Sequence, residues 1–344
     1  MTTSRGTTSL SDRSWEANSS KKLSDSFQRP INYLRISVTD RCNLRCIYCM
    51  PPQGITLLAH SEVLRYEEIQ AVAQAAASLG INKLRLTGGE PLVRSGLPHL
   101  VDMLSQIDGI DDIALTTNGV LLKRYAAQLR EAGLRRVNVS LDTLKRDRFH
   151  RITRHDKLGD VLGGIATAKA VGFDPVKVNM VVMRGTNDDE VLDFARLTLK
   201  DGWHVRFIEP MPFGTGDGSS FIPTSEIQER LLSLGPLEPC LHRYGNGPAK
   251  YFRFPGALGT VGFITPISEH FCFNCNRLRL TVDGKLRPCL LSDEEVDLKT
   301  ALRRGTSLEE LKGLIQQAVA AKPERHHLLE GVQPKGRAMC QVGG

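Results

Sequence analysis

The chain has 344 residues, of which 41% are hydrophobic and 24% are charged. A chain of this length can bury a substantial core, either as one large barrel or as two domains. It contains no run of about 18 apolar residues, which excludes a transmembrane helix. The net charge of +7 indicates anionic partners but does not distinguish nucleic acid, a membrane surface and a phosphorylated small molecule.

Residues 1–30 form the first distinct segment. They are rich in Ser and Thr and show almost no apolar pattern, which predicts a disordered extension. A transit peptide is the alternative, but Asp12, Glu16 and Asp25 disfavour it because such segments contain few acidic residues. There is no secretory signal and the cysteines are clustered, so we expect a cytoplasmic protein in a reducing compartment.

Short strand-like runs alternate with helical patterns from residue 31 to about 235. This alternation predicts a parallel sheet, either open or closed into a barrel. Helical stretches include 67–80 and 187–199; in the second, Asn187 and Glu190 have the spacing of an N-cap and its capping-box partner. The predicted strands are 33–38, 83–88, 113–118, 136–141, 176–182 and 204–210.

Polar and apolar residues alternate along these strands. Helices should cover the apolar faces, so the polar faces should line an interior. This predicts an open, cationic, solvent-filled lumen that suits a ligand with several negative charges. The alternative is a sheet with one face simply exposed to water. The cations on the polar faces are Arg35, Lys83, Arg85, Lys177 and Arg206.

The rhythm changes after about residue 235, where Gly, Pro and aromatic residues become frequent. The runs 250–254, 260–265 and 277–284 predict β hairpins, and 306–321 predicts a capped helix. We therefore predict three parts. They are an extension over 1–30, a barrel over 31–235 and an α+β region over 236–344 that ends in two glycines.

Three cysteines, Cys42, Cys46 and Cys49, follow the first predicted strand in a C-x3-C-x2-C array. The C-terminal end of a strand is where barrel enzymes place their chemistry. Three thiolates can bind three irons of a [4Fe–4S] cluster and leave the fourth iron open. A zinc site that lacks one ligand would also be open, and three unrelated buried cysteines are the remaining alternative.

A second group of three comprises Cys272, Cys275 and Cys289. A structural zinc ribbon is the alternative here, and His270 is close enough in sequence to complete it. Cys240 and Cys340 stand outside both groups, and we interpret them as ordinary small residues.

The first array, with Tyr48 before its last cysteine, resembles the signature of the radical S-adenosylmethionine (SAM) superfamily, and the GGEP sequence at 88–91 resembles that superfamily's GGEP loop. The resemblance implies a partial, six-stranded (β/α) barrel. It also implies that the open iron binds SAM, which is cleaved to a 5′-deoxyadenosyl radical. The implied SAM contacts are Tyr48, Gly89, Ser140 and Met211.

The second cysteine group and the NRLR sequence at 276–279 resemble one family within this superfamily, the GTP 3′,8-cyclases of molybdenum cofactor biosynthesis. The resemblance runs from about residue 31 to the C-terminus. It implies a second [4Fe–4S] cluster on Cys272, Cys275 and Cys289, whose open iron binds the guanine of GTP. Gly343–Gly344 resembles the family's double-glycine tail, which reaches into the active site. The residues implied to bind GTP are Arg35, Lys83, Arg85, Thr116, Lys177, Arg206, Arg277, Leu278 and Arg279, and we expect Arg277 and Arg279 to be essential.

The implied reaction converts GTP to (8S)-3′,8-cyclo-7,8-dihydroguanosine 5′-triphosphate. The deoxyadenosyl radical abstracts the 3′ hydrogen, and the resulting C3′ radical attacks C8 of the guanine. The implied partners are GTP, an electron donor, the cyclic pyranopterin monophosphate synthase that takes the product, and a second copy of the chain, with neither nucleic acid nor membrane. There are two alternatives. One is a peptide-modifying radical SAM maturase, and the other is a zinc protein that binds nucleic acid, which the pI near 9.0 favours.

Overall fold

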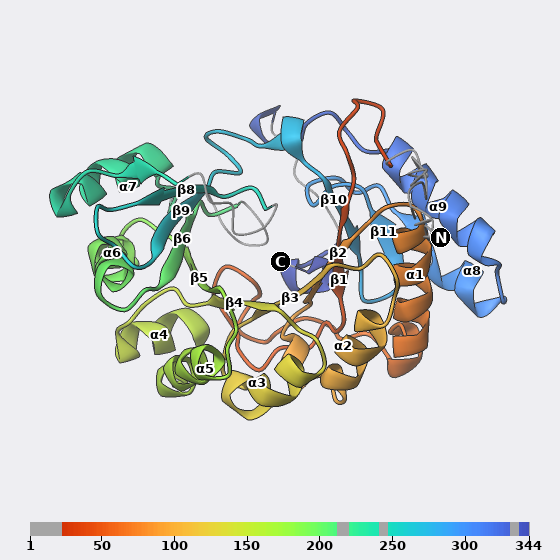
Figure 1. Cartoon of the computed structure of the whole chain (residues 1–344), viewed down its shortest axis with the longest axis horizontal. Coiled ribbons are helices and arrows are strands. Elements are labelled where there is room, and N and C mark those ends of the chain that lie inside the picture. Colours follow the sequence, from red (N-terminus) through yellow and green to blue (C-terminus); the bar gives the residue numbers. More distant parts are fainter. Residues whose placement is uncertain (1–22, 212–219, 241–246, 331–336, 344) are drawn as a thin grey trace, which may run out of the picture.

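The computed structural model describes residues 23–211, 220–240, 247–330 and 337–343. Within these ranges the strands form a single sheet of 12 strands, in the order β12-β11-β10-β1-β2-β3-β4-β5-β6-β9-β8-β7. The sheet curves around an interior without closing, and helices cover its outer side (Figure 1).

The strands are β1 (Tyr33–Ser37), β2 (Lys83–Thr87), β3 (Asp112–Thr117), β4 (Arg136–Ser140), β5 (Val176–Val181), β6 (His204–Ile208), β7 (Glu238–Pro239), β8 (Lys250–Arg253), β9 (Thr260–Ile264), β10 (Arg277–Leu280), β11 (Lys285–Arg287) and β12 (Val296–Asp297). The helices are α1 (Tyr66–Ser78), α2 (Leu97–Ser105), α3 (Leu122–Glu131), α4 (Arg146–Thr153), α5 (Leu158–Ala170), α6 (Val191–Lys200), α7 (Thr224–Leu231), α8 (Lys299–Arg303), α9 (Leu308–Ala320) and α10 (Met339–Val342).

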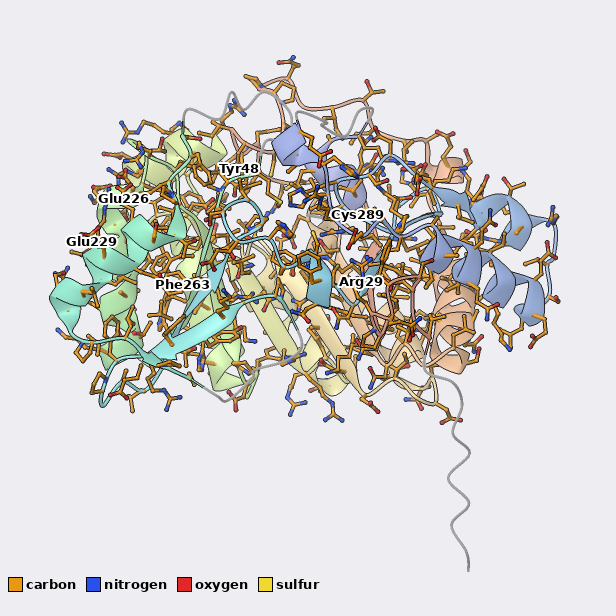
Figure 2. All side chains as sticks on the ribbon, turned by 90° about the horizontal axis from the view of Figure 1, so that it is seen from above. Arg29, Tyr48, Glu226, Glu229, Phe263 and Cys289 are labelled. Atoms are coloured by element: carbon orange, nitrogen blue, oxygen red, sulfur yellow. The ribbon has the colours of Figure 1, made fainter. Side chains whose placement is uncertain are left out.

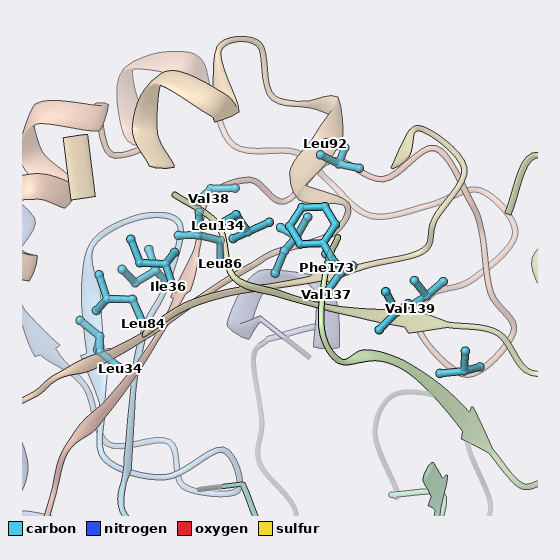
Figure 3. Packing of buried hydrophobic residues seen from close by; sticks show 14 of the residues in the cluster. Leu34, Ile36, Val38, Leu84, Leu86, Leu92, Leu134, Val137, Val139 and Phe173 are labelled. Carbon is cyan, nitrogen blue, oxygen red and sulfur yellow. The ribbon is translucent and has the colours of Figure 1, made fainter. Parts of the chain in front are cut away.

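All six strands predicted over residues 31–235 are present, and β1 to β6 pair in sequence order with parallel direction. The apolar positions align across the sheet: Leu34 faces Leu84, and Ile36 faces Leu86. Figure 3 shows these side chains packed together with Val137 in the buried cluster on the outer face. Burying this continuous apolar face against helices holds the strands in register. The predicted partial (β/α) barrel is therefore confirmed.

The C-terminal region extends both edges of this barrel. Strand β9 pairs in parallel with β6, and β10 pairs in parallel with β1. Each is also half of a predicted hairpin, β8–β9 or β10–β11, and both hairpins are confirmed. The sheet thus contains strands from both sides of the predicted boundary at residue 235, and that boundary stays a prediction.

Part of the predicted disordered extension, residues 23–30, is packed against the rest of the chain. Residues 1–22 lie outside the described residues. From Leu23 the chain packs against the rest of the molecule, and Asp25 and Arg29 are 4% and 5% exposed. Arg29 donates hydrogen bonds to the backbone oxygen atoms of Cys272 at 2.8 Å and Glu324 at 2.6 Å. The prediction of disorder is therefore wrong for residues 23–30, because a buried arginine fixes them to the C-terminal region.

The predicted cap of the helix after β5 is also wrong. Helix α6 begins after a 3₁₀ turn, and the Asn187 side chain instead accepts from the Met183 backbone N–H at 2.7 Å and donates to the Asp142 carbonyl at 2.8 Å. The Glu190 carboxylate accepts from the Thr143 hydroxyl at 2.5 Å. Both side chains join two loops at the C-terminal ends of the strands, a role that local spacing does not reveal.

None of the helices in the described part of the chain has the length and apolar character needed to cross a membrane.

Candidate active site

The strand registers bring the predicted cations onto the inner face of the sheet. Arg279, Arg35 and Arg85 occupy aligned positions on β10, β1 and β2. Lys177 on β5 aligns with Asn138 and His204, and Arg206 on β6 aligns with Asn179. Lys83, Thr116 and Arg277 lie on the same face. Leu278 does not: it aligns with Leu34 and is fully buried in the outer hydrophobic cluster.

These cations are covered rather than solvated. Arg85, Lys177, Arg206 and Arg279 are 9%, 4%, 7% and 7% exposed, so the expected solvent-filled lumen does not exist at these residues. Aromatic rings account for part of the cover. The Arg85 guanidinium lies 5.7 Å from the centre of the Tyr33 ring, and the Lys177 ammonium lies 5.3 Å from that of Tyr251. The contact of the Arg85 guanidinium with Tyr33 is a cation–π contact that partly replaces lost hydration.

The inner face carries an excess of positive charge. Burial, and then the charge of Arg206, lowers the pKa of Lys177 to about 5. Burial, and then Arg277, lowers the pKa of Arg279 to about 10. Within the described residues, Arg85, Arg206, Arg277 and Arg279 form no ion pair with a carboxylate. Several buried cations without carboxylates are unfavourable unless an anion joins them. The inner face therefore has the charge of an anion-binding site.

The C-terminal tail enters this interior (Figure 1). Arg279 donates to the Gly343 carbonyl oxygen at 2.6 Å, and Arg35 donates to the same oxygen at 3.1 Å. Gly343 has a φ of 72°, and a Cβ there would lie 2.7 Å from Cγ2 of Thr87, so a larger residue would be strained and crowded. Gly344 lies outside the described residues.

The first cysteine group lies on the loop that follows β1. The Cys42 sulfur accepts hydrogen bonds from the Leu44 backbone N–H at 3.4 Å and from the Asn118 amide at 3.8 Å. The three thiols lie close enough to interact: burial, and then the charge of Cys49, raises the pKa of Cys46 well above its usual range. This loop therefore brings three candidate thiolate ligands together at the C-terminal end of a barrel strand.

The GGEP loop after β2 packs directly beneath the cysteine loop. The Gly89 N–H donates to the Thr39 carbonyl at 2.7 Å, and a Cβ on Gly89 would lie 2.4 Å from the Arg41 carbonyl oxygen. The buried Glu90 carboxylate accepts from the Asn118 N–H at 2.6 Å, which places the amide that contacts Cys42. Gly89 is thus needed for the close packing of the GGEP loop against the cysteine loop, independently of any contact with SAM.

The remaining predicted SAM contacts lie around this loop. Tyr48 donates its hydroxyl proton to the Asp142 carboxylate at 2.6 Å, and burial raises the pKa of Asp142 to about 6. Ser140 ends β4, and Met211 follows β6. Ser140 and Met211 therefore lie at the same edge of the sheet as the cysteine loop that carries Tyr48.

Cys340 on α10 lies beside the first group. It is 4% exposed, and burial, with a contribution from Cys42, raises its pKa to about 11. The sequence alone does not indicate that Cys340 lies near the thiolate ligands. The tail that carries it is about 300 residues from the first cysteine array and has no periodic pattern.

The second cysteine group joins two segments. Cys272 and Cys275 lie on the loop before β10, and Cys289 follows β11, which pairs with β10. The Cys289 sulfur accepts from the Leu291 N–H at 3.4 Å. Burial raises the pKa of Cys275, but Arg277, which donates to its sulfur at 3.8 Å, and other cations outweigh burial and bring it to about 6.

The donor set suits iron–sulfur ligation. In the described ranges, no three His, Cys, Asp or Glu side chains form a group that could hold a single metal ion. In a [4Fe–4S] cluster each thiolate binds its own iron, and hydrogen bonds to the sulfurs tune the cluster. Cys42 and Cys289 already accept such bonds from N–H groups two residues ahead.

Sequence reasoning missed a set of buried carboxylates at the C-terminal ends of the strands. Glu90 and Asp142 each accept a backbone N–H from the C-terminal end of the next strand or the residue after it, whereas Asp40 and Glu209 accept one from further along the connection that follows their own strand. The signal was available, since each stands within about three residues of a predicted strand end. The pairs are Asp40 with Leu58, Glu90 with Asn118, Asp142 with Val181, and Glu209 with Thr224.

A curved parallel sheet with three cysteines on the loop after its first strand defines the class of radical SAM proteins, and the superfamily's sequence model matches residues 36–198. The family described as Molybdenum Cofactor Synthesis C matches residues 203–328. Together these matches favour a radical SAM protein over the zinc protein that binds nucleic acid.

The chain belongs to the GTP 3′,8-cyclase family. It is 55% identical over 326 residues to the GTP 3′,8-cyclase of Pelotomaculum thermopropionicum, covering 94% of this chain and 100% of that protein. It is 53% identical over 324 residues to the one from Moorella thermoacetica, with the same coverage of 94% and 100%. Among solved structures, SuiB of Streptococcus suis bound to S-adenosylmethionine has a TM-score of 0.56 at 12% identity, over 86% of this chain and 76% of SuiB. That likeness shows the shared fold alone.

Proposed function

We propose that this chain is a GTP 3′,8-cyclase that converts GTP to (8S)-3′,8-cyclo-7,8-dihydroguanosine 5′-triphosphate, the first step of molybdenum cofactor biosynthesis. Family membership supports this reaction. We assign GTP binding to the inner face because it holds a group of buried guanidinium ions without carboxylates. This group lies between the two cysteine groups. A triphosphate, with about four negative charges, matches that excess.

In this proposal Cys42, Cys46 and Cys49 hold the cluster that binds SAM, and Tyr48, Gly89, Ser140 and Met211 contact SAM. The bound cluster and SAM would supply the 5′-deoxyadenosyl radical that abstracts the 3′ hydrogen of GTP. The chain itself supports this site through the Glu90 and Asn118 contacts that position Cys42.

The chain's other contribution is to orient GTP. The phosphates are bound by Arg35, Lys83, Arg85, Lys177 and Arg206. The rest of the site is formed by Thr116, Arg277, Leu278 and Arg279. Leu278 contributes its backbone, because its side chain lies in the core. Cys272, Cys275 and Cys289 hold a second [4Fe–4S] cluster that binds the guanine. Holding C3′ near C8 converts an improbable encounter into an intramolecular step. The covered interior excludes water that would quench a radical.

The partners in this proposal are an electron donor, a cyclic pyranopterin monophosphate synthase that takes the product, and a second copy of the chain. The cytoplasm is the proposed compartment, because exposed irons need reducing conditions.

The test is an anaerobic reaction of the reconstituted, reduced protein with SAM and GTP, followed by mass spectrometry. We expect 5′-deoxyadenosine together with a GTP isomer of unchanged mass. Deoxyadenosine without a change in GTP would overturn the substrate, and cluster-loaded protein that forms no deoxyadenosine would overturn the radical chemistry. Lys177→Gln should abolish GTP turnover while iron content stays unchanged, and Lys169→Gln, at a surface lysine near Trp203, is the matched control.

A further inference from the structure

Lys322 is a buried lysine that neither the proposed SAM site nor the proposed GTP site uses. It follows α9 and is 3% exposed. Its ammonium nitrogen donates to the Arg277 carbonyl oxygen at 2.9 Å and to the Pro288 carbonyl oxygen at 2.6 Å. No carboxylate in the described part of the chain forms an ion pair with it. A buried ammonium ion without a counter-ion is strongly unfavourable, so a negative group is expected beside it.

The two carbonyl groups identify where that negative group is. Arg277 begins β10 two residues after Cys275, and Pro288 immediately precedes Cys289. The ammonium ion therefore ties the segment of one cysteine to the segment of the other. An ammonium ion has three N–H donors, and the two carbonyls engage two of them. The third N–H can donate to a thiolate sulfur of this group or to the cluster that the thiolates bind.

Two other cations lie near these segments: Arg277 donates to the Cys275 sulfur at 3.8 Å, whereas Arg29 is engaged elsewhere. Arg29 pairs with Asp25 at 2.6 Å and donates to the Cys272 carbonyl, so its charge is balanced. Arg29 and Cys289 lie on the side of the molecule that carries α8 and α9 (Figure 2). The first cysteine group, in contrast, has the buried carboxylates Glu90 and Asp142 as neighbours. The buried charged side chains beside the two groups thus differ in sign.

We propose that Lys322 is a positioning residue for the second cluster: its ammonium ion holds the Cys275 and Cys289 segments together and raises the reduction potential of the cluster they carry. The inference rests on the second cluster of the proposed function. A cluster with three thiolates is anionic, and an added electron makes it more so. A fixed positive charge nearby favours that electron, because net charge and hydrogen bonds set cluster potentials.

The experiment uses the full-length chain with Cys42, Cys46 and Cys49 changed to Ala, so that any cluster belongs to the second group. In this parent chain, Lys322→Arg keeps the charge, Lys322→Gln keeps N–H donors without charge, and Lys322→Met removes both. Lys312→Gln is the matched control, since Lys312 lies on α9, the helix that Lys322 follows, with its charge paired to Glu309. Each protein is reconstituted anaerobically with iron and sulfide, then analysed for iron and titrated by electron paramagnetic resonance.

We expect Lys322→Arg and Lys312→Gln to match the parent in iron content and potential. Lys322→Gln should retain iron but titrate at a more negative potential, and Lys322→Met should lose iron. A Lys322→Gln potential equal to that of the parent would overturn the charge role. If Lys322→Gln loses its iron, equal loss in Lys322→Arg would overturn the proposal. A parent chain that binds zinc or no cluster would refute the second cluster itself, and the inference with it, before any variant is compared.

Discussion

At the scale of single residues, the site depends on charges held in unfavourable surroundings. Burial and neighbouring guanidinium groups keep the pKa of Lys177 near 5 when the interior holds no anion. A buried lysine at neutral pH is then largely uncharged, and a triphosphate beside it would restore its proton. This coupling makes the protonation of Lys177 a reporter of phosphate binding.

We therefore predict that GTP binding takes up a proton at Lys177. Its pKa is about 5 in the free protein and higher in the complex, so affinity should fall as pH rises between these two values. Anaerobic calorimetry in buffers of different ionisation enthalpy measures the uptake directly. Lys177→Met should bind GTP more weakly and show no buffer dependence. Wild-type binding with no buffer dependence would contradict the prediction.

Glu90 is a second residue whose surroundings define its role. Its carboxylate accepts from the Leu92 N–H, the Thr117 hydroxyl and the Asn118 N–H at 3.0, 2.7 and 2.6 Å. Every partner is a donor, so an amide at this position would place an N–H group against a donor. Burial raises the pKa of Glu90 to about 7, so the carboxylate is mostly ionised at pH 8.

Glu90→Gln should lower the free energy of unfolding at pH 8 by about 1–3 kcal/mol, the cost of an unsatisfied buried polar group. Thermal or denaturant unfolding of the cluster-free protein measures it. The exposed Glu229, visible on the surface in Figure 2, supplies the control: Glu229→Gln should change stability by less than about 0.5 kcal/mol. Equal effects of the two substitutions would show that the Glu90 contacts do not stabilise the fold.

At the scale of elements, the close packing of the GGEP loop beneath the cysteine loop has a measurable consequence. The two loops are joined by backbone hydrogen bonds, and no side chain fits between Gly89 and the Arg41 carbonyl. A methyl group at residue 89 would have to push the cysteine loop away, because backbone cannot move aside as the end of a flexible side chain can.

Gly89→Ala should therefore reduce both iron incorporation at the first group and the melting temperature. Gly313 is the matched control, since nothing lies within 4 Å of a Cβ there and the residue is inside α9. Gly313→Ala should raise stability by about 0.5–1 kcal/mol through helix propensity. Normal iron content in Gly89→Ala would argue that the loops separate freely.

At the scale of the whole molecule, the C-terminal region extends the barrel sheet at both edges rather than standing apart from it. β9 and β10 cover the two edges that β6 and β1 would otherwise expose. Unpaired edges of a parallel sheet leave backbone groups unsatisfied and promote aggregation. The division at residue 235 stays a prediction, and whether residues 31–235 fold without these strands can be tested.

We predict that a fragment of residues 23–235 does not fold cooperatively. It lacks β9, β10 and the cover that they give the inner face, so it should be insoluble or lack a sharp unfolding transition. Circular dichroism with heating compares it with residues 23–344. A soluble fragment with a cooperative transition would show instead that 31–235 is an independent domain.

The sequence by itself determined the six barrel strands, the two C-terminal hairpins and the face on which the cations stand, because these follow from local periodicity. Motif spacing and resemblance also identified the superfamily and the family. Contacts between distant segments decided the rest. They placed Cys340 beside Cys42, brought Arg29 to the Cys272 loop and buried the cations under Tyr33 and Tyr251. No local pattern encodes such contacts, since they depend on how the sheet curves and on which loops meet at its C-terminal edge.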